Sequence, residues 1–171
     1  EIPELKSRLQ KLSEVLEKTL DIDGILELAG EAPELAAPET EMLIQKDPAF
    51  GYRTGEKVRI GVADDEAFCF FYADNLNLLE QMGAELVRFS PIHDRELPKE
   101  LDGLLLSGGY PELNGEALEE NQEMCTRIRE AILEGMPCLA ECGGFMYLHQ
   151  EMEDMEGKQR RVCGVIPGRA Y

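Results

Sequence analysis

The residues best suited to chemistry are a cysteine and the two glycines after it, in the run Ala140-Glu141-Cys142-Gly143-Gly144. A short apolar strand is predicted at residues 138–140 and a helix from about Gly143, so the chain turns sharply at Cys142. Such a nucleophile elbow projects its side chain into a cleft and needs small neighbours because the turn is strained. The helix N-terminus favours a thiolate, and the Gly143 N–H points to where an oxyanion would form.

A second glycine pair follows another predicted strand, in the run Ser107-Gly108-Gly109-Tyr110-Pro111-Glu112 after residues 104–106. A Gly-Gly turn here can aim a free backbone N–H into the same cleft. One nucleophile and two N–H donors are the minimum that acyl transfer requires. Each loop alone is also compatible with an ordinary core cysteine or a strand end. Their occurrence at neighbouring strand ends favours a catalytic site.

These loops must be positioned by a parallel α/β sheet. From Lys57 onward short apolar strands alternate with helices, which predicts a three-layer fold with helices on both faces of the sheet. Ligands of such sheets bind beyond the carboxyl ends of the strands, where both glycine loops fall. The tail at residues 158–171 predicts a hairpin or a further strand, and the fold is expected to be incomplete at the C-terminus. The strands are expected at 58–63, 86–89, 104–106 and 138–140, and the helices at 75–82, 121–132 and from 143 through 149.

The N-terminal part has a different organisation. Leucines recur at helical spacing within residues 1–30, at Leu5, Leu9, Leu12 and Leu16. Asp23 is expected to cap a second, short helix that Gly30 ends. Residues 31–56 hold several prolines and glycines and predict a linker, with a short extended piece at 42–44. Residues 57–171 are then the second domain.

The charge balance excludes some partners. The sequence has 17 Lys and Arg against 35 Asp and Glu, a formal net charge of −18. A chain without a basic stripe is a poor ligand for nucleic acid or for an anionic membrane surface. No apolar run approaches the roughly 18 residues that a membrane-spanning helix needs. The acidic start resembles no secretory signal, so a cytoplasmic location is expected, and the absence of an initiator Met suggests a piece of a longer chain.

The cysteines and acidic runs have ordinary structural interpretations. Five cysteines at irregular spacing, with no Cys-x-x-Cys, predict neither disulfides nor a metal site. Cys69, Cys125, Cys138 and Cys163 are interpreted as core residues. The acids Asp64-Asp65-Glu66 are expected in a solvated loop rather than around a cation, and residues 151–156 in an exposed turn.

The motifs described above carry a family resemblance over residues 57–171. The segment 60–147 resembles the glutamine amidotransferase domain of the triad (class I) type, and more narrowly that domain in the cobyrinic acid a,c-diamide synthase family, whose flavodoxin-like fold it implies. Met146 stands where the general triad family tends to carry Gln, which fits the corrinoid subfamily. The matching motifs are Asp65-Glu66-Ala67-Phe68-Cys69-Phe70-Phe71-Tyr72 with Asn75-Leu76, Ser107-Gly108-Gly109-Tyr110-Pro111-Glu112, and Ala140-Glu141-Cys142-Gly143-Gly144-Phe145-Met146-Tyr147-Leu148.

The resemblance implies a set of roles for these residues. Cys142 would attack the amide carbon of glutamine, forming a γ-glutamyl thioester and releasing ammonia, and water would then release glutamate. Gly143 and Gly109 would donate their backbone N–H groups to the oxyanion. The residues expected to bind or shape the site for glutamine are Gly108, Tyr110, Phe68 and Tyr72.

The resemblance also implies partners that this chain does not itself bind. Residues 1–30 look like the helical end of an ATP-using synthetase domain that is absent here, and no cofactor is expected in this chain. In the full-length enzyme, ATP and Mg²⁺ would activate the a and c acetate side chains of cobyrinic acid, a step of cobalamin biosynthesis. The tetrapyrrole would bind the missing domain, and a homodimer is left open.

The triad needs a histidine, and the sequence offers only His93 and His149. His93 is expected in a loop. His149 is expected at the surface or at a helix end, two turns along the helix that leads away from Cys142 and roughly 10 Å from it. Neither is placed to act as the base, so the triad His is expected to be absent from this chain, and the chain alone to be nearly inactive.

Other functions stay open at this point. A cobyric acid synthase, a hydrogenobyrinate enzyme or a nickel-tetrapyrrole a,c-diamide synthase would carry a similar domain, because the tetrapyrrole site belongs to absent residues. A non-catalytic α/β module that binds a partner or a small ligand is the alternative from another class. The two classes differ in whether Cys142 is a reactive thiol.

Overall fold

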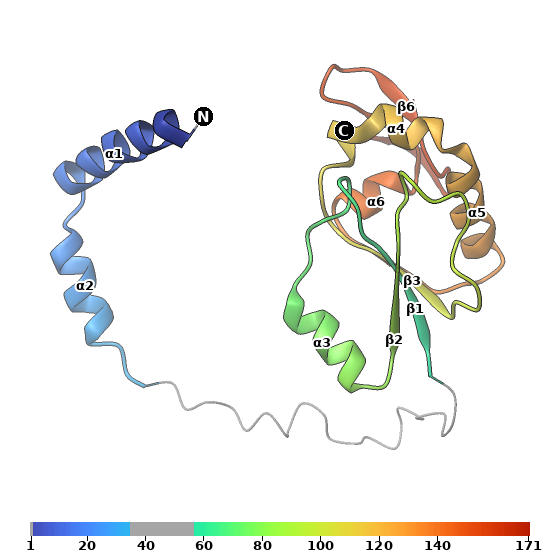
Figure 1. Ribbon diagram of the computed structural model, residues 1–171, viewed down its shortest axis with the longest axis horizontal. Coiled ribbons are helices and arrows are strands. Elements are labelled where there is room, and N and C mark those ends of the chain that lie inside the picture. Colours follow the sequence, from blue (N-terminus) through green and yellow to red (C-terminus); the bar gives the residue numbers. More distant parts are fainter. Residues whose placement is uncertain (1, 35–56) are drawn as a thin grey trace. The chain divides into compact units, whose positions relative to one another are not determined.

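The computed structural model describes residues 2–34 and 57–171, which form two units (Figure 1). The first unit holds α1 (Ile2–Thr19) and α2 (Ile22–Gly30). The carboxylate of Asp21 accepts a hydrogen bond of 3.0 Å from Gly24 N. The cap of α2 is therefore Asp21, and the expectation of Asp23 was wrong. The extended piece expected at 42–44 lies outside the described residues.

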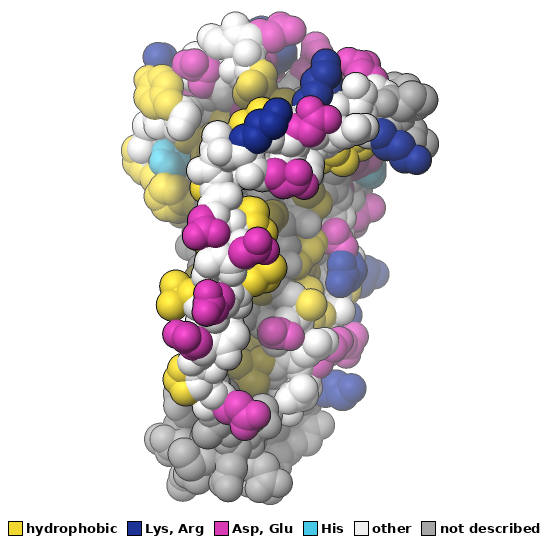
Figure 2. All heavy atoms as spheres, turned by 90° about the vertical axis from the view of Figure 1, so that its left-hand side faces the viewer, with side chains coloured by type: hydrophobic (Ala, Val, Ile, Leu, Met, Phe, Trp, Pro, Cys, Tyr) yellow, Lys and Arg dark blue, Asp and Glu magenta, His cyan; other side chains and the backbone are white. Residues whose placement is uncertain are grey.

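The leucine stripe of α1 is exposed. Its members Leu5, Leu9, Leu12 and Leu16 keep 39% to 57% of their surface exposed. Figure 2, which faces these helices, shows hydrophobic side chains lying among acidic ones. An amphipathic helix normally buries such a stripe, and within residues 2–34 nothing covers it. Among the described helices, none is long and apolar enough to cross a membrane.

The second unit is built on a parallel sheet, as predicted. Its strands are β1 (Arg59–Ala63), β2 (Glu85–Phe89), β3 (Gly103–Leu106) and β4 (Cys138–Ala140). They lie in the order β2-β1-β3-β4 and every neighbouring pair is parallel. This is the order of a flavodoxin-like sheet, and it places the carboxyl ends of all strands at one edge.

Helices cover both faces of this sheet. Along β3 the side chains of Leu104 and Leu106 are buried in the core, whereas Leu105 lines a groove with Leu76 of α3 (Ala73–Gln81). Successive side chains of a strand point to opposite faces, so α3 lies on one face and α5 (Gln122–Leu133) on the other (Figure 1). The largest fully buried hydrophobic side chains of the core are Phe68, Leu106, Leu118, Met124, Ile128, Tyr147 and Met152.

A small mixed sheet follows, and it corrects two expectations. Helix α6 (Gly143–Tyr147) is short, and β5 (His149–Glu153) begins where a continuing helix was expected. β5 pairs with β6 (Gln159–Arg161) and with β7 (Ile166–Ala170), so the tail at 158–171 holds strands, as predicted, but they pair with β5 and not with each other as a hairpin. Met152 is fully buried between half-buried glutamates, so residues 151–153 are strand and the expected exposed turn is confined to Met155 and Glu156. The helix stops because residues 163–166 donate backbone hydrogen bonds to the carbonyls of residues 147–149.

Two short helices after β3 were not foreseen: η2 (Pro111–Asn114) and α4 (Gly115–Glu120). Arg160 of β6 anchors this region, because its buried guanidinium pairs with Asp154 at 2.7 Å and with Glu119 of α4 at 3.2 Å. Asn121 caps α5 through Met124 N, and its amide donates to the carbonyls of Pro91 and Asp94. These contacts fix the α4–α5 layer against the sheet.

Candidate active site

An open cleft of about 360 Å³ lies at the carboxyl ends of β1, β3 and β4. It is lined by Phe70, Tyr72, Gly108, Gly109, Tyr110, Glu141 and Cys142. The structure thus brings together most predicted residues of the two glycine loops with Tyr72 from the segment after β1, whereas Gly143 is buried and does not itself line the cleft. Phe70 and Glu141 also line the cleft and were not among the predicted site residues.

Cys142 has the backbone of a nucleophile elbow. Its φ of 47° and ψ of −112° lie in a region that side chains other than glycine rarely adopt, and its side chain is exposed. A residue in such a conformation costs of order 1–3 kcal/mol and persists only where its surroundings enforce it. The strain therefore requires specific contacts on both sides of the turn.

Those contacts join the two glycine loops. Gly144 N donates to the carbonyls of both Ser107 (3.1 Å) and Glu141 (2.9 Å), and Glu141 N donates to Leu106 O (3.0 Å). A Cβ on Gly144 would lie 2.0 Å from Leu106 O, so only glycine allows this approach. The elbow is held because the end of β4 is bonded to the end of β3.

Gly109 makes a similar approach to the segment after β1. A Cβ on Gly109 would lie 2.1 Å from Ala67 O, and Tyr110 N donates to that same carbonyl at 2.9 Å. Phe70 N donates to Gly108 O at 3.0 Å. These bonds attach the segment that carries the aromatic rings to the loop after β3.

The two amides expected to stabilise an oxyanion lie on touching loops. A Cβ built on Gly143 would be 3.3 Å from Gly109 N. Within residues 57–171, neither the Gly143 nor the Gly109 N–H donates a hydrogen bond to another protein group. Two free donors beside an exposed thiol are the arrangement that acyl transfer uses.

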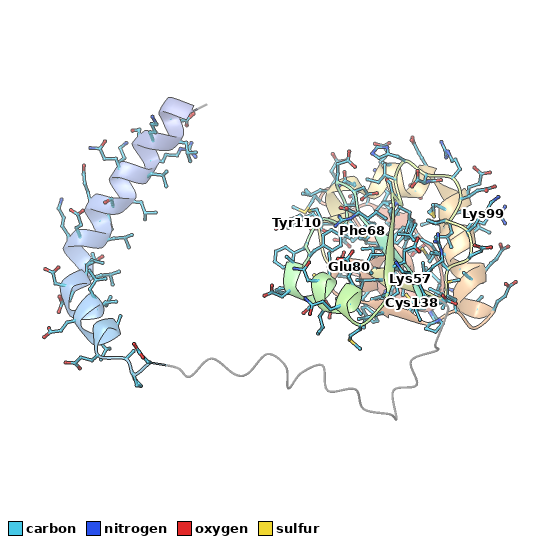
Figure 3. The ribbon with its side chains drawn as sticks, turned by 60° about the horizontal axis from the view of Figure 1, so that its bottom comes forward. Lys57, Phe68, Glu80, Lys99, Tyr110 and Cys138 are labelled. Atoms are coloured by element: carbon cyan, nitrogen blue, oxygen red, sulfur yellow. The ribbon has the colours of Figure 1, made fainter. Side chains whose placement is uncertain are left out.

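The aromatic residues divide between the cleft and the core. Phe70 and Tyr72 are more than half exposed, and their rings meet edge to face with centroids 5.9 Å apart. Phe68 is fully buried and packs on Tyr147 with ring centroids 5.2 Å apart, so it lies outside the cleft. Figure 3 shows Phe68 inside the unit and Tyr110 at its margin. The segment from Ala67 to Tyr72 is apolar or aromatic throughout, so its local pattern does not separate Phe68 from the exposed rings.

Neither histidine lines the cleft. His93 lies in a turn, as expected, and its Nε2 is 3.0 Å from a carboxylate oxygen of Glu66. The Nδ1 of His149 is 3.0 Å from Phe145 O, and its ring stacks edge-on against that of Phe145. His149 belongs to β5, so its expected place two turns along a helix was wrong.

The acids after β1 organise the loop. Asp65 is half-buried, and its carboxylate accepts hydrogen bonds from Ala67 N, Phe68 N, Ser90 Oγ and Ile92 N. Asp64 pairs with Arg88. Only Glu66 of the three is exposed, so the expectation of a solvated loop holds for that residue alone. Within the described ranges, no group of three His, Cys, Asp or Glu is placed to hold a metal.

The remaining cysteines differ from one another. Cys125 and Cys163 are buried, as expected, and Cys138 is half-buried, but Cys69 is exposed and its assignment to the core was wrong. Burial raises the pKa of the Cys138 thiol to about 11 and that of Cys163 well above its ordinary range. Cys125 Sγ lies 3.3 Å from the hydroxyl of Tyr147.

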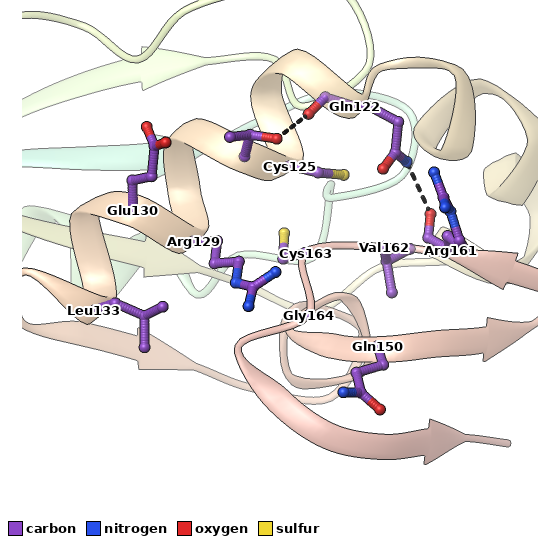
Figure 4. A pocket seen from close by; sticks show the side chains of 11 residues that line it. Gln122, Cys125, Arg129, Glu130, Leu133, Gln150, Arg161, Val162, Cys163 and Gly164 are labelled. Carbon is purple, nitrogen blue, oxygen red and sulfur yellow. Dashed lines mark hydrogen bonds between the residues drawn. The ribbon is translucent and has the colours of Figure 1, made fainter.

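Cys125 and Cys163 form the floor of a separate hollow of about 420 Å³ between α5 and the strands of the mixed sheet (Figure 4). Arg129 and Arg161 stand at its rim. None of its lining residues contributes to the cleft of Cys142. The hollow is therefore not part of the candidate active site.

Comparison with known proteins adds evidence of a different kind. Residues 59–171 match the family described as the CobB/CobQ-like glutamine amidotransferase domain. The chain is 48% identical over 167 residues to cobyrinate a,c-diamide synthase of Methanosarcina acetivorans. The aligned segment covers 97% of this chain and 33% of that protein. It is 42% identical over 165 residues to the protein of the same name from Dehalococcoides mccartyi, covering 96% and 35%. It is 44% identical over 158 residues to hydrogenobyrinate a,c-diamide synthase of Pseudomonas aeruginosa, covering 90% and 36%.

The chain thus spans about a third of the length of these curated relatives. The matches extend well beyond the family domain, because they cover 90% or more of the chain whereas the domain begins at residue 59.

Substituting Gly144 by Ala is expected to lower the free energy of unfolding by about 2–4 kcal/mol, because the new methyl group would overlap Leu106 O. Urea denaturation followed by circular dichroism measures the loss. Gly108→Ala is the matched control, since its Cβ would meet its nearest neighbours at 3.6 Å, an ordinary contact. Equal losses in the two variants would contradict the steric argument.

Brief treatment with iodoacetamide at neutral pH is expected to label Cys142 before the other cysteines. Cys69 controls for exposure alone, because it is exposed but lies on no elbow. Cys138, whose pKa burial raises to about 11, and the buried Cys125 and Cys163 should react slowly. Peptide mapping by mass spectrometry reads out the order. Equally fast labelling of Cys69 and Cys142 would argue against an activated thiol at the elbow.

Proposed function

This chain belongs to the family of CobB/CobQ-like glutamine amidotransferase domains, and on that premise we propose that Cys142 hydrolyses glutamine to supply ammonia for the a,c-diamidation of a corrin precursor. The observation that carries the proposal is the exposed Cys142 thiol on a left-handed turn, beside the free N–H groups of Gly143 and Gly109. A module that only binds a partner has no need of this combination.

The proposed reaction has two halves. The Sγ of Cys142 attacks the carboxamide carbon of glutamine. The carboxamide oxygen then gains negative charge and accepts hydrogen bonds from Gly143 N–H and Gly109 N–H. The carbon–nitrogen bond breaks, the nitrogen leaves as ammonia after gaining a proton, and a γ-glutamyl thioester remains. Water then attacks the thioester, releasing glutamate and restoring the thiol.

The ammonia is proposed to be used by the larger part of the protein that the relatives possess. Their names support cobyrinate as the compound amidated. The Pseudomonas relative favours hydrogenobyrinate as a second candidate. Gly108, Tyr110 and Tyr72 are proposed to shape the glutamine site, whereas the burial of Phe68 gives it only a supporting role in the core.

ATP and Mg²⁺ do not fit the residues of this chain. The sequence contains no Gly-x-x-x-x-Gly-Lys-Ser/Thr loop. Across 2–34 and 57–171 no acidic or His/Cys cluster of three could hold a metal ion. We therefore assign the ATP-using ligase step to the longer protein and derive no part of it from the cleft.

The domain boundaries and location are proposals of the same kind. Residues 1–30 are proposed as the helical end of a synthetase domain, 31–56 as a linker, and 57–171 as the amidotransferase domain. The exposed leucines of α1 are consistent with such a junction or with a homodimer. A cytoplasmic location stays a prediction from the sequence.

A chimera tests the proposed function. This chain would replace the matching third of the Methanosarcina protein, and cobyrinate diamide formation would be measured with glutamine or with ammonium chloride as nitrogen source. Cys142→Ser is expected to abolish the glutamine-dependent reaction and to leave the ammonia-dependent one, because only the first needs the thiol. Cys69→Ser is the control and should retain both. Loss of both reactions in Cys142→Ser alone, with the fold intact, would contradict the assigned role.

The chain alone is expected to release glutamate from glutamine at least about 100-fold more slowly than a full-length relative, because general acid–base help is typically worth that much or more. Neither of its two histidines lines the cleft, so none is placed to protonate the leaving nitrogen. A coupled glutamate assay measures the rate. Robust turnover that disappears in His149→Ala would identify His149 as the base and overturn this expectation.

A further inference from the structure

We propose that Glu141 is a specificity-determining residue that binds the α-ammonium group of glutamine, an inference that rests on the proposed function. Glu141 directly precedes the nucleophile, and its exposed side chain lines the cleft of Cys142. It also lines the adjoining groove of about 250 Å³ between the sheet and α3. The carboxylate therefore stands at the boundary between two hollows that share the aromatic residues Phe70 and Tyr72.

Glu141 is the only charged residue among those that line the cleft. The cleft is formed otherwise by glycines, aromatic rings and the thiol, so Glu141 supplies its only carboxylate and no lysine, arginine or histidine lines it. In the part of the chain that the structure describes, the Glu141 side chain takes part in no hydrogen bond and no ion pair, unlike Asp65 or Glu119. The cleft thus presents a carboxylate with no charged partner among the residues that line it.

The backbone of Glu141 is held firmly. Its N–H donates to Leu106 O at 3.0 Å, and its carbonyl accepts from Gly144 N at 2.9 Å. These are the bonds that hold the elbow, so they fix the backbone of Glu141 next to that of Cys142, whose Cα atom lies about 3.8 Å away across a trans peptide. A ligand whose reactive carbon reaches the thiol will bring a group a few bonds away within reach of this carboxylate.

Glutamine has such a group. At neutral pH it carries an ammonium and a carboxylate on its α-carbon and a neutral carboxamide at the other end. A carboxylate attracts the ammonium and repels the carboxylate, and aromatic faces add attraction for a cation. The rings of Phe70, Tyr72 and Tyr110 line the same cleft and are each about half exposed or more. The carboxylate and the aromatic rings of the cleft therefore favour binding of an amide that carries a primary ammonium group over an amide that lacks one.

The test uses two alkylating probes on the chain itself. One is the chloromethyl ketone of glutamine, in which the ketone replaces the carboxamide, and the other is the same molecule without its α-amino group. In each case Cys142 Sγ bonds to the chloromethyl carbon and chloride leaves, so the second-order rate of Cys142 modification is read by mass spectrometry. The ratio of the two rates isolates the α-ammonium, because any change in thiol reactivity cancels.

The wild-type chain is expected to prefer the amino-bearing probe by about 10- to 100-fold, the range of one charge-assisted hydrogen bond. Glu141→Gln should reduce the ratio to near unity, and Glu141→Asp should retain part of it. Glu112→Gln is the control for losing a negative charge nearby, because Glu112 lies on η2 and does not line the cleft. It should keep the full preference.

Each result has a separate meaning. A preference that survives in Glu141→Gln, or that is lost equally in Glu112→Gln, would overturn the role of Glu141. A wild-type chain that modifies Cys142 rapidly with both probes but without preference would overturn it too, while leaving Cys142 as the nucleophile. If Cys142 reacts with either probe no faster than Cys69, the proposed function itself fails.

Discussion

The close approach of Gly144 to the carbonyl of Leu106 is the constraint on which the cleft depends. It brings the end of β4 against the end of β3 closely enough for Gly144 N to bond both Ser107 O and Glu141 O. The chain can then turn only through a left-handed residue, and Cys142 occupies that position. The strain at Cys142 is thus offset by two backbone hydrogen bonds and by packing that any larger residue at 144 would prevent.

The segment after β1, which carries the aromatic residues of the cleft, is held in place by the carboxylate of Asp65. Asp65 satisfies two backbone amides of its own loop and reaches the loop after β2 through Ser90 and Ile92. This frees the following residues to bond the loop after β3, through Phe70 N and through Ala67 O. The acids at this strand end therefore serve to hold the backbone of the loop in place. The aromatic rings reach the cleft because this loop is anchored at both ends.

Local patterns were sufficient to predict the four strands of the parallel sheet, their parallel arrangement and the sharp turn at Cys142, because each depends on a short apolar run or on adjacent glycines. The predictions that were wrong concern positions whose secondary structure or burial is set by residues far away in the sequence. His149 and Met152 belong to a strand because residues 159–170 pair with them, and no pattern near residue 150 indicates that partner. Phe68 was expected in the cleft since a run of aromatics does not show which ring faces Tyr147. Glu141 was missed because a charged residue beside a nucleophile has no periodic signal.

The same hydrogen bonds hold both the nucleophile and the carboxylate beside it. Glu141 N is bonded to Leu106 O, and Glu141 O to Gly144 N, so neither residue can move without the other. The proposed reactivity of the thiol and the proposed recognition of the α-ammonium of glutamine would then both depend on one turn rather than on two separate parts of the site. The proton transfers are different, because no histidine lines this cleft. In the proposed reaction, positioning and covalent attack are therefore assigned to the strand ends, whereas the proton transfers are assigned to a group outside this turn.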